Sequence, residues 1–386
     1  MNYNTFCMKI CLRQILHTQN RGKVAHYLLL MVLVMCGTGS GLFAQDASFS
    51  QYNLTPFYYN PAYTGNHGGY QLSATYRSLW PNVPGKTITG PLSTAFAVFD
   101  ASLKAGNSFN AGLGVFAMTN VEGEGYLTTN TFGVSYAQHF TKISHKGDAM
   151  PRIQISLGFK AYINSISVNR DKLVFSDQLS LLDGITGASA ADQNGVAHKI
   201  TADADAGMLM INNFKGKDNW YNELGLSLAH ILSPNESLTG AQNQQSRLPR
   251  KYAITYRSSA GFARHKFYLG PSVLFENQGR FFELNTGVDL FVNPNPGNNV
   301  IPLCFSVMNR FCVHPDVNNT NAIILSARYK GTMGKDRRII YNIGFAVDLP
   351  YSALAMQTKG AYELSLSVLF PRKGNNNFSK CPYSMN

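Results

Sequence analysis

Apolar and polar residues alternate along most of this chain. The clearest example lies near its end, where apolar side chains occupy every second position and small or polar ones lie between them: Tyr362, Leu364, Leu366, Val368 and Phe370 against Ala361, Glu363, Ser365 and Ser367. A period of two places the two sets on opposite faces of a β-strand. About fourteen such segments follow one another, each about 10 to 13 residues long, which is the length that a tilted strand needs to cross a bilayer. The pattern predicts an all-β fold, a transmembrane antiparallel β-barrel of about 14 strands.

The predicted strands fill a barrel domain over residues 69–370. They are 69–79, 91–103, 109–119, 126–140, 151–164, 200–212, 219–231, 250–262, 265–276, 281–292, 300–312, 321–330, 338–349 and 360–370. In the fifth strand the alternation is cleanest, and it predicts outward Ile153, Ile155, Leu157, Phe159, Ala161 and Ile163 against inward Gln154, Ser156, Gly158, Lys160 and Asn164. The second and third strands alternate less clearly, so their inward faces are ambiguous.

The first 44 residues differ from the rest of the chain. Residues 1–26 contain basic but no acidic residues, and an apolar run, 27–34, leads to small residues and Ala44. This order predicts a secretory signal peptide over residues 1–44. The alternative is a lipoprotein signal that uses Cys36, but Met35 stands where a small residue is expected. No later apolar span reaches the roughly 18 residues of a membrane helix, so we expect a multi-pass β-barrel of the cell outer membrane.

The lengths of the connections suggest an orientation. An even number of strands puts both chain termini on one side, and we expect that side to be periplasmic, because outer-membrane barrels have short periplasmic turns and long outer loops. The two longest predicted connections, 165–199 and 232–249, then lie outside, while the tight connection 277–280 is an exception. Basic residues gather on the predicted periplasmic rim: Lys142, Lys146, Lys215, Lys217, Lys335, Arg337 and Arg338. These side chains either snorkel toward lipid phosphates or form a docking ring for an acidic partner.

Composition and inward-facing charges favour a filled lumen. The chain has 34 Gly, 24 Phe and 20 Tyr with only 14% charged residues, as expected for strands flanked by aromatic girdles. The positions predicted to face inward carry charges of both signs: Asp203, Asp205, Glu223, Glu276, Glu283, Asp289, Asp348 and Glu363, with Lys160, Arg257, Arg310 and Arg328. Charges of both signs across a narrow lumen predict cross-barrel ion pairs and ordered water, which argue against a wide open pore. Asp203 and Asp205 could be read as a calcium pair, but two carboxylates are a weak signal.

Motifs for catalysis are missing from the sequence. It has no nucleophile elbow, phosphate loop, paired zinc spacing or dinucleotide fingerprint. A membrane lipase would need a serine and a histidine at one boundary, and His230 with Ser233, or His139 with Ser144, are neighbours of that kind. Sequence neighbours of this type arise by chance in a serine-rich chain. We therefore expect no enzyme, no metal site and no cofactor.

The segment before the barrel, residues 45–68, is dense in aromatic residues. Pro56 and Pro61 prevent it from forming a regular helix or a central strand. An irregular aromatic stretch in the periplasm has to pack against something, and we expect this to be the inner mouth and lumen of the barrel or a partner protein. The residues expected to form this plug or to bind the partner are Phe49, Tyr52, Asn60, Pro61, Tyr63 and Gly65.

The same segment resembles the opening of the PorP/SprF-like family of Bacteroidota outer-membrane proteins. The similarity is carried by Gln45-Asp46, by Phe49-Ser50-Gln51-Tyr52 and by Asn60-Pro61-Ala62-Tyr63-Thr64-Gly65, and it continues in residues 76–81, 175–178, 230–235 and 248–252. Two departures stand out. Ala47 replaces a proline that is usual in the family, and a tail, 371–386, follows the aromatic Phe370 that would close the last strand.

The resemblance implies a role in type IX secretion. Members of this family are outer-membrane barrels tied to periplasmic secretion-ring or peptidoglycan-linked proteins, and some help to secrete or retain a surface adhesin with a type B C-terminal domain. The resemblance thus implies a non-enzymatic component of the secretion and gliding system, with outer-membrane lipid around it and no nucleic acid as partner. A passive outer-membrane diffusion channel is the alternative function.

Overall fold

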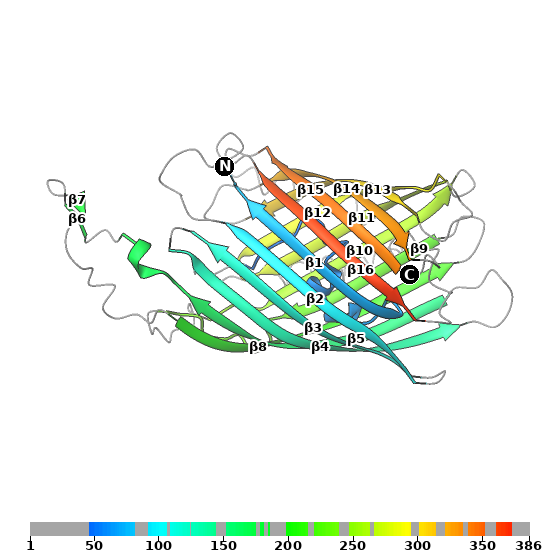
Figure 1. Ribbon diagram of the computed structural model, residues 1–386, viewed down its shortest axis with the longest axis horizontal. Helices are drawn as coiled ribbons and strands as arrows, with labels where there is room; N and C mark the ends of the chain where they lie inside the picture. Colours follow the sequence, from blue (N-terminus) through cyan, green and yellow to red (C-terminus); the bar gives the residue numbers. More distant parts are fainter. Residues whose placement is uncertain are drawn as a thin grey trace, which may run out of the picture. The chain divides into compact units, whose positions relative to one another are not determined.

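The computed structural model describes residues 46–81, 92–105, 109–123, 125–143, 152–174, 178–180, 184–185, 198–214, 220–238, 247–262, 266–294, 301–313, 321–334, 339–351 and 360–372. In this part of the chain, fourteen antiparallel strands close into one barrel in the order β1-β16-β15-β14-β13-β12-β11-β10-β9-β8-β5-β4-β3-β2 (Figure 1). The predicted signal peptide, and the tail from residue 373 onward, lie outside the described residues.

The strand prediction is confirmed, with shifts of a few residues at the ends. The barrel strands are β1 (Gly69–Leu79), β2 (Ser93–Ala105), β3 (Phe109–Glu122), β4 (Leu127–Ile143), β5 (Arg152–Ser167), β8 (His198–Phe214), β9 (Trp220–Ala229), β10 (Lys251–Phe262), β11 (Phe267–Gln278), β12 (Phe281–Val292), β13 (Leu303–Val313), β14 (Ala322–Met333), β15 (Ile339–Pro350) and β16 (Ala361–Pro371). A two-stranded ribbon of β6 (Leu179–Ser180) and β7 (Gly184–Ile185) lies in the connection after β5.

The outer face of the barrel is an apolar band. Side chains on alternate positions point away from the lumen and are about half exposed, among them Leu157 at 50%, Ile163 at 54% and Phe345 at 49%. Their strand neighbours Ser156 and Asn164 are buried inside. Such a band is what lipid requires of a barrel. No helix in the described residues is long and apolar enough to cross a membrane.

The two ends of the barrel differ in their connections. We name the end where β1 begins and β16 finishes, with Gly69 paired to Pro371, the terminal mouth. The opposite end, with Leu79 paired to Ala361, is the loop mouth (Figure 1). The two longest connections, 168–197 and 230–250, lie at the loop mouth, as predicted, and so does the tight turn 279–280 between β11 and β12.

The ambiguity of the second and third strands has a physical cause. Phe96 and Val98 in β2 and Phe116 in β3 point into the barrel and are buried there. They belong to an aromatic cluster with residues of the N-terminal segment. Because the lumen at this place is apolar, both faces of these strands carry apolar side chains, and the period of two becomes weak.

Candidate functional site

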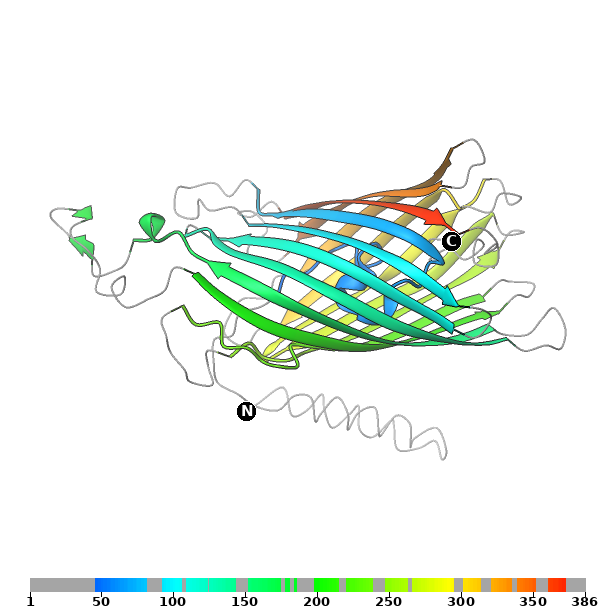
Figure 2. The same cartoon turned by 60° about the horizontal axis from the view of Figure 1, so that its bottom comes forward.

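The N-terminal segment, residues 46–68, lies inside the barrel and spans it from mouth to mouth (Figure 2). At the loop mouth, the backbone N–H of Asp46 donates to the side chain of Gln278 at 3.0 Å. At the terminal mouth, the backbone N–H of Gly68 donates to Ser102 Oγ at 2.8 Å, and β1 begins at the next residue. The sequence predicted packing against the inner mouth and lumen or against a partner protein, and the structure shows contacts along the lumen as far as the opposite mouth. We call residues 46–68 the plug.

Two short helical turns shape the middle of the plug. Helix α3 (Pro56–Tyr59) and the 3₁₀ turn η1 (Pro61–Tyr63) each begin with a proline, whose fixed φ suits the first position of a helix. Between them, the Asn60 side chain accepts a hydrogen bond from the Ala62 N–H at 2.8 Å and so caps η1. The two prolines that exclude regular structure therefore also place these turns.

Glycines in the wall let the plug backbone come close. A Cβ atom on Gly158 of β5 would lie 2.3 Å from the Ala62 nitrogen, and one on Gly207 of β8 would lie 2.1 Å from Asn60 Oδ1. On β3, a Cβ atom on Gly112 would lie 2.0 Å from the Thr64 carbonyl oxygen. A Cβ atom fits at none of these distances, so the wall is shaped to hold the plug backbone at Ala62 and Thr64 and the side chain of Asn60.

The plug also packs aromatic rings inside the lumen. Phe49 is fully buried and packs edge-on against Tyr58, with ring centroids 5.0 Å apart. Phe57 contacts Phe116 of the wall at a centroid distance of 5.6 Å. Edge-to-face pairs of this kind add about 0.5–1.5 kcal/mol each beyond the burial of their area.

Buried acids of the wall hold the backbone of the plug near Ser50. The Glu363 carboxylate accepts the backbone N–H groups of Ser50 at 2.6 Å and Gln51 at 2.8 Å. Asp348 accepts Ser50 Oγ at 2.5 Å and pairs with Arg77 at 2.7 Å and Arg310 at 2.6 Å. These ion pairs join strands close together in the wall, from β1 to β13. The prediction of cross-barrel pairs is wrong for these residues, because the plug lies in the lumen between opposite walls.

A second polar cluster holds the other half of the plug. Asn60 Nδ2 donates to the carbonyl oxygens of Met208 at 2.9 Å and Leu226 at 3.2 Å. The Tyr63 hydroxyl donates to Glu223, which is also paired with Arg257. All of these polar groups are buried, and each would be costly to bury without a partner.

Near the terminal mouth, Asp100 and His139 complete the fixation. Asp100 accepts the Gly65 N–H at 2.5 Å and contacts His67 Nε2 at 2.8 Å. The His139 ring contacts the Thr64 carbonyl oxygen at 2.9 Å and Ser156 Oγ at 2.8 Å. This histidine and its serine partner are buried under the plug.

At the loop mouth, Asp46 ends the plug in a cluster of charges that we call the latch. Its carboxylate contacts His230 Nε2 at 2.8 Å and Lys251 Nζ at 2.9 Å, and the other ring nitrogen of His230 contacts Asp203 at 2.8 Å. Burial lowers the pKa of His230, but the carboxylates, led by Asp46, outweigh burial and raise this pKa to about 10. Glu236, in the loop after β9, lies beside the latch, and burial raises its pKa to about 7.

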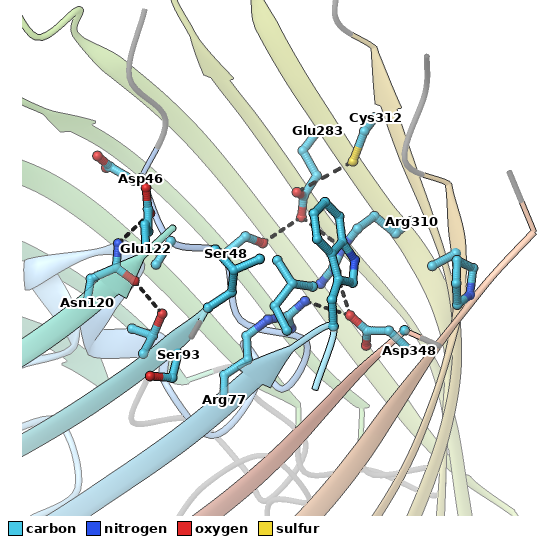
Figure 3. A pocket seen from close by; sticks show the side chains of 18 of the residues that line it. Asp46, Ser48, Arg77, Ser93, Asn120, Glu122, Glu283, Arg310, Cys312 and Asp348 are labelled. Atoms are coloured by element: carbon cyan, nitrogen blue, oxygen red, sulfur yellow. Dashed lines mark hydrogen bonds and ion pairs between the residues drawn. The ribbon is translucent and has the colours of Figure 1, made fainter. Parts of the chain in front are cut away.

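Two hollows open at the loop mouth on either side of residues 46–47. One has a volume of about 480 Å³ and is floored by Arg77, Arg310 and Asp348, with Glu283 beside them (Figure 3). The other has a volume of about 310 Å³ and has aromatic and aliphatic walls over Lys160 and Lys251. Both hollows end on the plug.

The predicted plug or partner-binding residues all lie in the lumen. Phe49, Tyr52, Asn60, Pro61 and Tyr63 are buried, and Gly65, at a φ of 66°, fits against Gly112 where no side chain could. The structure does not describe the side chains of the predicted basic rim. Lys146, Lys215, Lys217, Lys335, Arg337 and Arg338 lie outside the described residues, and for Lys142 only the backbone, in β4, is described.

The inward charges were largely predicted. The predicted acids are all buried, as are Lys160, Arg257 and Arg310, while Arg328 is half-buried. Sequence reasoning missed Arg77, Lys251 and the latch role of His230. In the part of the chain that is described, no group of three or more His, Cys, Asp or Glu residues could hold a metal ion.

Comparisons with known proteins give one family. The family model of the type IX secretion system membrane protein PorP/SprF matches residues 42–368. No curated protein matches the chain. Among solved structures, a Pseudomonas aeruginosa FadL homologue is similar at 10% identity and a TM-score of 0.41, over 86% of this chain and 99% of that one. The monoaromatic hydrocarbon channel CymD has 10% identity and a TM-score of 0.40, over 87% and 96%. These structural similarities are too weak to support an argument about function.

The close contact between Gly158 of the wall and the Ala62 backbone of the plug can be tested by mutation. Gly158→Ala should destabilise the protein by about 1–3 kcal/mol, because the new methyl group collides with the backbone of Ala62. Gly114→Ala is the matched control, since its nearest neighbours lie at 3.1 Å and it should cost less. Denaturant unfolding in detergent measures both. When residues 46–65 are replaced by a flexible linker, the cost of Gly158→Ala should vanish, and an unchanged cost would contradict the contact.

The second prediction concerns the latch. The pKa of His230 is raised from 6.5 to about 10. The stabilisation of the latch by protonated His230 is therefore complete below pH 6.5 and is lost as the pH rises toward 10. A spin label on Ala47→Cys, in a Cys381→Ser background, should therefore become more mobile between pH 7 and pH 10. In a His230→Gln variant the label should be mobile throughout. A label that stays immobile at pH 10 in the parent protein would refute this role of His230.

Proposed function

This chain belongs to the PorP/SprF family of type IX secretion system membrane proteins, and we propose that it is a non-enzymatic docking component of the secretion and gliding machinery. The family and the barrel place it in the outer membrane. We propose further that it docks periplasmic secretion-ring or peptidoglycan-linked proteins on one side and helps to secrete or retain a surface adhesin on the other.

The single observation that carries this proposal is the filled lumen. The plug lies in the barrel from mouth to mouth, and its polar groups are bound by buried side chains and backbone carbonyl groups of the wall. A passive channel needs a continuous water-filled path, which an N-terminal segment of this kind removes. With transport through the lumen disfavoured, the two mouths become the surfaces that can contribute to secretion.

We assign different partners to the two mouths. Long loops are typical of the outer surface of such barrels, so the loop mouth, with its two hollows, would face the exported client. The terminal mouth would then face the periplasm, where the connections carry the basic residues of the predicted rim. A basic rim suits an acidic partner and speeds its association.

This assignment also determines on which side of the membrane the mature N-terminus would lie. Asp46 lies at the loop mouth, so the chain immediately after the predicted cleavage site would be near the cell surface rather than in the periplasm. This part of the proposal replaces our expectation of a periplasmic segment 45–68.

A gene-deletion strain tests the proposal. Deletion should lower the surface amount of at least one exported protein by about tenfold while its synthesis continues, and reversal of the rim charges by Lys335→Glu, Arg337→Glu and Arg338→Glu should reproduce much of this loss. The matched control is Lys335→Arg with Arg337→Lys and Arg338→Lys, which changes the same three residues and keeps their charge. Surface proteomics and immunoblotting measure the outcome.

Two results would count against the proposal. An unchanged set of surface proteins after deletion would remove the secretion role altogether. A normal secretion phenotype for the rim variant would remove the periplasmic docking surface and leave only the surface role.

A further inference from the structure

Strand β8 extends further at the loop mouth than its neighbour β9. It pairs with β5 from His198 to Asn213. It pairs with β9 only from Ala206 onward, because β9 ends at Ala229. The part of β8 from His198 to Asp205 therefore extends past the end of β9 at the loop mouth, and Figure 1 shows β8 reaching far to that side.

The backbone of this extension has a free edge. The Ala204 carbonyl oxygen accepts the Ile231 N–H at 3.0 Å, so the backbone groups of Ala204 point to the β9 side. Strand alternation points the backbone groups of Ala202 and Ile200 to the same side. Within the described ranges, no backbone or side-chain group pairs with them. The Asp203 carboxylate accepts the Ala204 N–H at 2.7 Å and the Leu232 N–H at 3.2 Å, and it marks where pairing stops.

This free edge begins where the apolar band ends toward the loop mouth. Ala202 lies beside Ile163, which lies beside the outward-facing Phe132. In the next row of outward-facing cross-strand pairs toward the loop mouth, Ile200 lies beside Ser165, which lies beside Asn130. Asn130 accepts a hydrogen bond from Thr119 at 2.8 Å, so this row is polar except for Ile200.

Ile200 is the exception that needs an explanation. It is 66% exposed, although its cross-strand neighbours Ser165 and Asn130 are polar. Unpaired strand edges are a liability that proteins usually blunt with charge, proline or a covering loop. Among the described residues, the backbone groups of Ala202 and Ile200 on this edge have no such cover, and Ile200 adds an exposed apolar side chain.

We infer that the free edge of β8 at Ile200 and Ala202 takes up an extended strand of the exported client. Alternating N–H and C=O groups are matched by another extended backbone, which is how β-strand addition gives affinity, and an apolar side chain of the added strand would pack on Ile200. A lipid offers no such row of donors and acceptors. This inference rests on the proposed function, since it names the surface by which the client is held.

The test uses a proline that touches only the free edge. In Ala202→Pro, the lost N–H is the one that faces the client, and the ladder with β5 is preserved. Ala202→Val is the matched control, because it keeps the N–H. The client is the exported protein whose surface amount falls in the deletion strain. The surface amount of this client should fall by about tenfold with Ala202→Pro and stay at the parental level with Ala202→Val.

A second variant guards against a folding defect. Ile200→Lys leaves the backbone intact and lies in the polar row, so the barrel should keep its thermal transition and its heat-modifiable mobility on gels. It should lower the surface amount of the client by about threefold to tenfold through loss of the apolar contact.

The outcomes separate the two proposals. If deletion removes a client but Ala202→Pro and Ile200→Lys retain it, the free edge is not its site and the inference is overturned, while the proposed function stands. If the purified protein is a dimer that Ala202→Pro converts to a monomer without loss of client, a second copy occupies the edge, and the inference is overturned as well. If deletion removes no client, the proposed function itself fails.

Discussion

The charged groups inside this barrel need partners, and the rest of the structure depends on how that need is met. An uncompensated buried charge costs several kcal/mol. Here Glu363 is paired with Arg77 and accepts two backbone N–H groups of the plug, and Asp46 of the plug is paired with Lys251 and His230. Wall and plug are thus complementary halves of one polar network, and neither half is satisfied alone.

This complementarity determines what the protein can do. Because glycines in β3 and β5 leave room for the plug backbone, and one in β8 for the Asn60 side chain, the shape of the wall is matched to the plug. A lumen filled in this way leaves the mouths as working surfaces. The unequal heights of β8 and β9 then give the loop mouth a feature that a uniform barrel lacks, a strand edge without a partner in the described residues.

Much of the barrel could be predicted from the sequence, because lipid on one side and polar groups on the other impose a period of two. The prediction weakened at Phe96, Val98 and Phe116, where the lumen is apolar. The path of the plug could not be predicted, since the spacing of residues does not reveal which carboxylate will meet which backbone amide. Inward-facing glycines such as Gly158 and Gly112 were the available signal, because a strand lacks a side chain where another backbone comes close.

The conductance of the purified protein in planar bilayers tests the central claim most directly. With the plug in place, the parent protein should give no large and stable conductance steps. A variant with residues 46–65 replaced by a flexible linker, its folding checked by gel mobility, should give such steps. Large and stable steps from the parent protein would contradict the account.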